Sequence, residues 1–97
     1  MINLKTPYEM AVDVAERFRH IRKAKNITIK SLSEKSGVPY STVRRFESTG
    51  EIGFTSFVKL VSAINEDDQI TSLFTGKVPG SLEEVINENR RKAGSFS

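Results

Sequence analysis

Two adjacent arginines, Arg44 and Arg45, occur in the stretch GVPYSTVRRFESTG. A guanidinium group carries a rigid fork of N–H donors, which matches the O6 and N7 acceptors of guanine or the oxygens of a phosphate. On a helical wheel, Tyr40, Ser41 and Ser48 share the face of the two arginines, without an acid among them. Such a face could bind a base edge and a phosphate together. The alternative is an ordinary exposed helix whose arginines are solvated.

The sequence offers little for catalysis or metal binding. There is no cysteine, and His20 is the single histidine, so neither thiolate chemistry nor a histidine zinc site is expected. Glu66, Asp67 and Asp68 lack the alternating oxygen ligands of a calcium loop, and a helix N-terminus explains them better. Neither a phosphate-binding glycine loop nor a Ser-His-Asp arrangement occurs. We therefore expect no enzyme activity, no cofactor and no metal.

Positive charge is concentrated in one block of the chain. Residues 17–45 contain nine Lys or Arg against one acid, Glu34, whereas residues 1–16 and 46–97 are each net acidic. The whole chain carries only +3. A basic block with acidic flanks indicates that one face meets a polyanion, although a solvated helix face is the alternative.

Length and composition indicate one soluble domain. The chain has 97 residues, of which 37% are hydrophobic and 28% charged. No apolar run is long enough to span a bilayer, and the N-terminal MINLKTPYEM does not resemble a secretory signal. We expect a cytoplasmic protein without a membrane contact.

Helical periodicity and capping residues predict an all-α chain. The first three helices are expected over residues 8–25, 28–36 and 39–48. The apolar side of the first helix holds Val14, Phe18 and Ile21. Thr28 is a suitable N-cap for the second helix, and Gly37 a suitable end. Two short helices joined by a glycine-containing turn form a helix-turn-helix unit.

The rest of the chain is expected to add two or three helices around this unit. Thr55 or Ser56 would cap a fourth helix, and a short fifth helix would carry Ile70, Leu73 and Phe74. A capping box starting at Ser81 predicts a sixth helix over residues 82–92. The predicted organisation is an N-terminal arm (1–7), a domain (8–75), and a linker with a C-terminal tail (76–97).

The stretch IRKAKNITIKSLSEKSGVPYSTVRRFESTGEI, residues 21–52, resembles the Cro/CI-type (XRE) helix-turn-helix family. The matching positions are Arg22, Ile27-Thr28, Leu32-Ser33, Gly37-Val38, Ser41-Thr42-Val43, Glu47 and Gly50. The resemblance covers roughly residues 10–74. It implies a compact five-helix, lambda-repressor-like fold that binds double-stranded DNA, with the third helix in the major groove.

The resemblance also implies roles for individual residues. The residues at positions that face the bases are Tyr40, Ser41 and Arg45, with Arg44 beside them. Thr28, Ile29 and the backbone N–H groups of their turn would meet a phosphate. Further phosphate contacts are expected from Ser48 and from the basic block, through Lys23, Lys25, Lys30, Lys35 and, alternatively, Arg44. Arg22 and Glu47 would form an internal ion pair.

Three positions depart from the family pattern. Ile29 stands where a glutamine often makes a phosphate contact, Ser33 replaces the usual alanine, and Pro39 cannot supply a capping hydroxyl. Affinity would then depend more on the lysines and arginines of the basic block.

A narrower resemblance, carried by the words FESTGEI and SLEEV within residues 6–86, is to HipB-like antitoxins encoded beside HipA-type kinase toxins. It implies a repressor that binds the kinase and autoregulates their operon. A phage-type repressor without a toxin partner, and a protein-interaction module with weak DNA binding, remain as alternatives. RNA binding is less favoured, because the sequence shows no aromatic stacking strip.

A homodimer on a palindromic operator is expected, because two-fold dimers bind half-sites about 34 Å apart. The apolar residues available for its interface are Ile70, Leu73, Phe74, Val78, Leu82, Val85 and Ile86. Closure of the monomer core is the alternative use of Leu73 and Phe74. The sequence leaves open whether the protein represses or activates.

Overall fold

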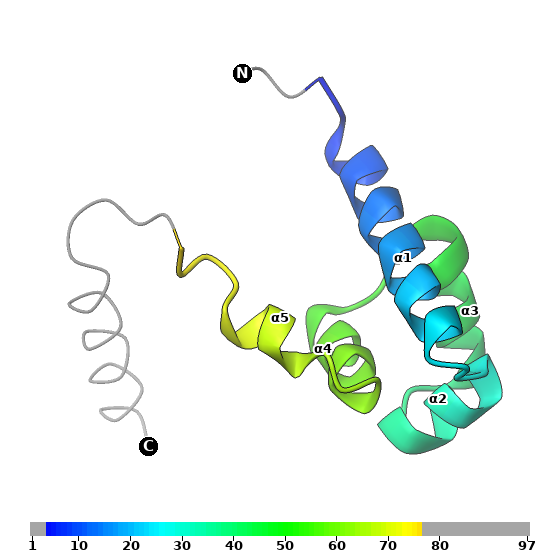
Figure 1. Ribbon diagram of the computed structural model, residues 1–97. Helices are drawn as coiled ribbons and strands as arrows, with labels where there is room; N and C mark the ends of the chain where they lie inside the picture. The colour runs from blue at the N-terminus through cyan, green and yellow to red at the C-terminus, as the bar shows by residue number, and fades with distance from the viewer. Residues whose placement is uncertain (1–3, 77–97) are drawn as a thin grey trace, which may run out of the picture.

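The structure is a computed structural model that describes residues 4–76 as five α-helices (Figure 1). They are α1 (Pro7–Ala24), α2 (Ile29–Ser36), α3 (Tyr40–Thr49), α4 (Phe54–Ala63) and α5 (Asp67–Thr71). No strand occurs in this part of the chain, so the all-α, helix-turn-helix expectation is confirmed. The predicted sixth helix, residues 82–92, lies outside the described residues.

The first two helices begin at the capping residues. The Thr6 hydroxyl accepts the Glu9 N–H at 3.1 Å while the Glu9 carboxylate accepts the Thr6 N–H at 3.1 Å, which is a capping box. Helix α1 therefore starts at Pro7, one residue before its predicted start. The predicted N-cap of α2, Thr28, accepts the Ser31 N–H at 3.0 Å.

Glycines in the left-handed conformation end α2 and α3. Gly37 has φ of 76° and Gly50 has φ of 78°. A Cβ on Gly50 would lie 2.7 Å from the backbone carbonyl carbon of Ala11, whereas a Cβ on Gly37 would meet nothing within 4 Å. The end of α3 is therefore pressed against α1 at Gly50.

The predicted bounds of the last two helices are wrong. Helix α4 is capped by Gly53, not by Thr55 or Ser56, because the Gly53 carbonyl already accepts the Phe57 N–H at 3.0 Å. Helix α5 ends before Leu73 and Phe74, and Phe74 has φ of 64°.

One hydrophobic core joins the first four helices. Its buried members are Ala15, Phe18, Leu32, Val38, Val43, Phe46, Leu60, Val61 and Ile64. Phe46 of α3 makes edge contacts with Phe18 of α1 and Phe57 of α4, each at a ring-centroid distance of 5.4 Å. Full burial of a side chain of this size contributes about 1.5–3 kcal/mol. This aromatic cluster fixes α3 against the rest of the domain.

A buried ion pair also ties α1 to α3. Arg22 donates from Nε to one Glu47 carboxylate oxygen at 2.7 Å and from Nη2 to the other at 2.8 Å. Its remaining terminal nitrogen donates to the Ile27 carbonyl at 2.7 Å. The two side chains are 7% and 6% exposed, so the pair is shielded from water. Its two-pronged geometry restricts rotation of α3 relative to α1.

Candidate nucleic-acid interface

Helix α3 turns its apolar residues inward and a polar face outward. Val43 and Phe46 are buried, as the helical wheel predicts. The residues on the opposite face, Tyr40, Ser41, Arg44, Arg45 and Ser48, are all exposed. Because Glu47 is held inside by Arg22, no acid of α3 reaches this outer face. The sequence-predicted base contacts therefore lie together on one exposed helical surface.

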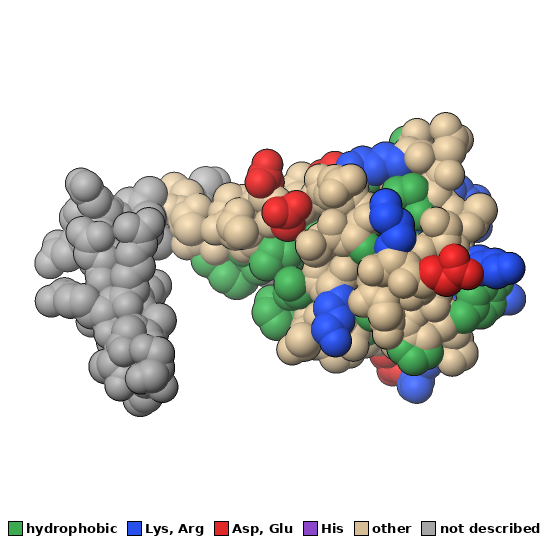
Figure 2. Space-filling view, turned by 90° about the horizontal axis from the view of Figure 1, so that it is seen from below, with side chains coloured by type: hydrophobic (Ala, Val, Ile, Leu, Met, Phe, Trp, Pro, Cys, Tyr) green, Lys and Arg blue, Asp and Glu red, His purple; other side chains and the backbone are tan. Residues whose placement is uncertain are grey.

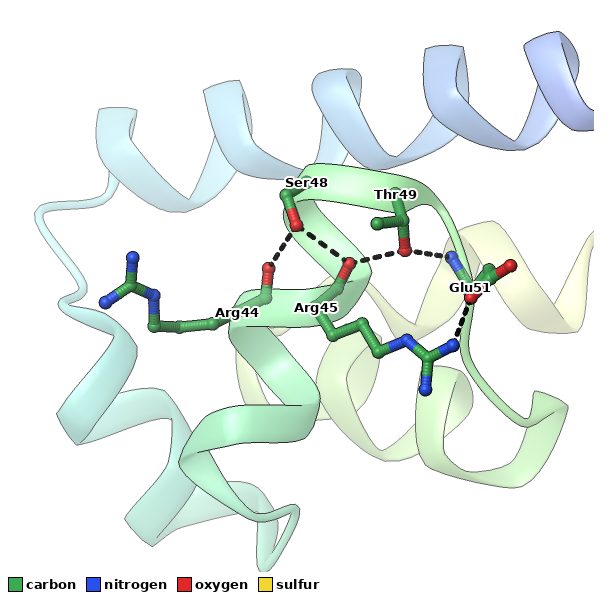
Figure 3. Close-up of polar contacts among 5 residues, drawn as sticks. All are labelled: Arg44, Arg45, Ser48, Thr49 and Glu51. Carbon is green, nitrogen blue, oxygen red and sulfur yellow. Dashed lines mark hydrogen bonds and ion pairs between the residues drawn. The ribbon is translucent and has the colours of Figure 1, made fainter.

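The two adjacent arginines extend in opposite directions from α3 (Figure 3). Arg44 reaches toward α2, whereas Arg45 reaches toward Glu51 just after the end of α3, where Nη2 and a carboxylate oxygen are 2.5 Å apart. Within residues 4–76, the Arg44 guanidinium has no hydrogen-bond or ion-pair partner. The pair of arginines thus offers one unengaged cation and one engaged cation.

Arg44 borders a polar hollow of about 230 Å³ between α1, α2 and α3. The hollow is lined by Arg19, Arg22, Ile29, Arg44, Glu47 and Ser48. Arg22 and Glu47 neutralise each other, which leaves the charges of Arg19 and Arg44 beside the first residue of α2. A helix N-terminus and two guanidinium groups together favour a phosphate. Arg19 belongs to the basic block, but the sequence alone does not mark it as a contact residue. Only the fold shows that it lies beside this hollow.

The predicted contacts at the start of α2 and the end of α3 are partly engaged within the protein. The Ile29 side chain packs against the core, so only its backbone N–H is available to a ligand. The Thr28 hydroxyl oxygen is occupied by the Ser31 N–H. The Ser48 hydroxyl is within hydrogen-bond distance of the Arg44 and Arg45 carbonyls, at 3.1 and 3.2 Å. The chain's exposed cations must therefore supply most of the charge for a bound polyanion.

Among the predicted lysine contacts, Lys25 is engaged elsewhere. Its Nζ donates to the Ile64 carbonyl at 2.5 Å and lies 2.8 Å from a Glu66 carboxylate oxygen. The hydrogen bond from Lys25 is the main cause that lowers the pKa of the Glu66 carboxyl below its ordinary value. An acid within the protein therefore already neutralises Lys25. Lys23, Lys30 and Lys35 are exposed and have no such partner in the described part of the chain.

The family assignment agrees with this geometry. A family model described as Helix-turn-helix matches residues 18–69, which is more than half of the chain. The chain belongs to the helix-turn-helix family of DNA-binding regulators. Searches of the curated proteins and of the solved structures found no significant match. The match to this helix-turn-helix family includes both helices of the unit and the turn between them.

Residues 4–76 contain neither a candidate metal site nor a candidate membrane-spanning helix. No group of three or more His, Cys, Asp or Glu side chains could hold a metal ion there. None of the described helices has the length and apolar character that crossing a membrane requires.

Proposed function

We propose that this helix-turn-helix protein is a sequence-specific DNA-binding repressor whose helix α3 enters the major groove. The observation that carries the proposal is the acid-free outer face of α3 beside the polar hollow at the start of α2. A major groove admits an α-helix, and an adjacent phosphate would fit beside the N-terminus of the neighbouring helix.

The opposite directions of the arginines suggest a division of their roles. Tyr40, Ser41 and Arg45 would contact base edges. Arg44 and Arg19 would hold a phosphate beside Ile29, which favours the phosphate alternative for Arg44 over a base contact. The remaining phosphate contacts would come from Thr28, Ser48, Lys23, Lys30 and Lys35. Phosphate contacts position a protein on DNA, whereas base contacts determine the preferred sequence.

Substituting Arg45 tests the base contact. The R45A variant should lose about 1–3 kcal/mol of binding free energy on the preferred duplex and relax its preference at one base pair. The K30A variant is the matched control. Loss of a phosphate contact should weaken binding to preferred and random duplexes alike, and should reduce the logarithmic salt slope of the binding constant by about one charge. Both are measured by fluorescence anisotropy. An equal loss on preferred and random DNA for R45A would reject the base contact.

A homodimer is part of the proposal, and an apolar groove supports it. The groove has a volume of about 370 Å³ and lies between α1, α4 and α5, with Val14, Phe57 and Leu73 among its lining residues. Phe74, next in the chain, is 86% exposed. Figure 2 shows hydrophobic side chains gathered beside the segment that leads to the grey residues. A second copy seated here would cover apolar surface that the monomer leaves in contact with water.

Sedimentation of a groove variant tests the dimer interface. L73D should sediment as a monomer at concentrations where the wild type is a dimer, because a carboxylate cannot be buried there without a partner. A wild type that is itself monomeric would reject the homodimer, and an L73D dimer would place the interface elsewhere. The other predicted interface residues, Val78, Leu82, Val85 and Ile86, lie outside the described residues.

We further propose that the protein is an antitoxin that binds a HipA-type kinase and represses their shared operon. This finer role rests on the resemblance carried by FESTGEI. The alternative is an interaction module in which DNA binding is secondary.

Deleting residues 80–97 separates the two roles. If that segment serves only the kinase, the truncated protein should bind DNA normally but fail to rescue growth when the kinase is co-expressed. Normal rescue would exclude this segment from toxin neutralisation.

A further inference from the structure

Glu51 is an acid at the edge of the otherwise basic surface of α3. Its carboxylate lies 2.5 Å from Nη2 of Arg45, the arginine to which base contact is assigned. Their side chains are 69% (Arg45) and 55% (Glu51) exposed. An exposed pair in water contributes little to folding stability, so stability does not account for this placement.

The backbone around Glu51 is held in place by several contacts. The Thr49 hydroxyl donates to the Arg45 carbonyl at 2.7 Å and accepts the Glu51 N–H at 3.2 Å (Figure 3). Gly50 donates its N–H to the Phe46 carbonyl at 2.8 Å and is pressed against α1. Glu51 therefore follows α3 at a fixed position, from which its carboxylate reaches back to Arg45.

The ion pair with Glu51 changes how much Arg45 contributes to binding different DNA sequences. While Glu51 neutralises it, Arg45 adds little to the attraction of a random duplex, and the carboxylate repels nearby phosphates. A phosphate can bind Arg45 but repels the Glu51 carboxylate, whereas a G·C pair offers a hydrogen-bonding group to each of the two side chains. Guanine offers two acceptors to the guanidinium, and the cytosine amino group is a donor that a carboxylate can accept.

We propose that Glu51 is a specificity-determining residue that restrains Arg45 and releases it where a base pair satisfies both side chains. The proposal rests on the proposed function, because it assigns a role within the same DNA-binding surface. Its consequence is that Glu51 lowers affinity for random DNA more than affinity for the preferred sequence. Such an acid improves discrimination by penalising the wrong partner rather than by strengthening the right one.

The test compares four variants with the wild type on a preferred and a scrambled duplex, over a series of salt concentrations. E51Q removes the charge and keeps the shape. E16Q is the charge-matched control, because Glu16 is exposed on α1 and has no ion pair in the described part of the chain. R45A and the double variant R45A/E51Q show whether Glu51 acts through Arg45.

E51Q should bind the scrambled duplex about two- to fivefold more tightly than the wild type, with a smaller gain on the preferred duplex. The logarithmic salt slope on scrambled DNA should steepen by about one charge. E16Q should leave the ratio of the two affinities unchanged, and E51Q should not change that ratio in the R45A background.

Two results would overturn the proposal while the wild type still prefers one duplex. One is an equal gain for E51Q on both duplexes, as a bulk charge would give. The other is an unchanged effect of E51Q in the R45A background. A wild type without any sequence preference would instead reject the proposed function, and this inference with it.

Discussion

Arg22 is a buried charged side chain, and three hydrogen bonds explain how it can be buried. Two go to Glu47 and one to the Ile27 carbonyl. The pairing with Glu47 follows from the family resemblance, whereas the carbonyl contact could not be predicted, because sequence spacing does not show which loop carbonyl will face a side chain. A buried pair of this kind is costly to break, since the remaining charge keeps its desolvation penalty.

The R22A variant should therefore lose about 3–5 kcal/mol of unfolding free energy, because Glu47 would be left buried without its partner. R19A on the same helix is the control, because Arg19 is exposed, and it should change stability by less than about 0.5 kcal/mol. Urea unfolding of both variants measures the difference. Equal stabilities of R22A and R19A would contradict a structural role for the pair.

The candidate site shows the same division between predictable and unpredictable features. The outward position of Arg44 and Arg45 follows from helical periodicity alone. The engagement of Lys25 by Glu66 and of Arg45 by Glu51 does not, because charge counts carry no information about distances between segments. Both engagements alter the site, since they neutralise two of its predicted cations.

At the level of elements, the bounds of α1, α2 and α3 were predicted to within one residue, because capping residues and glycines mark them. The predicted start of α4 lies too far along the chain, after its actual start at Phe54. Thr55 and Ser56 are good capping types, yet Phe57 packs against Phe46 and Phe18, and its N–H donates to the Gly53 carbonyl in the turn before. Tertiary packing outweighed local capping preference at this position.

The two glycines that end α2 and α3 give a matched pair of substitutions. G37A should lower the free energy of unfolding by about 1–2 kcal/mol, which is the strain of an alanine in the left-handed conformation. No further loss is expected, because its Cβ would meet no neighbour. G50A should carry the same strain and lose about 1–3 kcal/mol more, because its Cβ would overlap the Ala11 backbone. Thermal and urea unfolding compare them. Equal losses would show that α3 does not press on α1 at this point.

At the level of the whole molecule, one helix-turn-helix domain gives a small DNA interface. Single DNA-binding modules bury about 600–1,000 Å² of protein surface. The basic block of residues 17–45 supplies attraction to any duplex, while only a few side chains on α3 can distinguish bases. Composition predicted a single domain and a polyanion partner. The hollow beside α2 and the apolar groove each combine residues from several helices, so they became visible only in the fold.

The most direct test of the DNA-binding account is fluorescence anisotropy with two duplexes, one from the DNA upstream of the protein's own gene and one with a scrambled sequence. The measurements are made at about 50 and about 200 mM salt, because phosphate contacts weaken strongly across this range. The account predicts tighter binding to the native duplex, with a preference that persists at the higher salt. Equal binding to both duplexes that disappears at the higher salt would mean that the basic surface provides only electrostatic attraction, which would contradict a sequence-specific regulator.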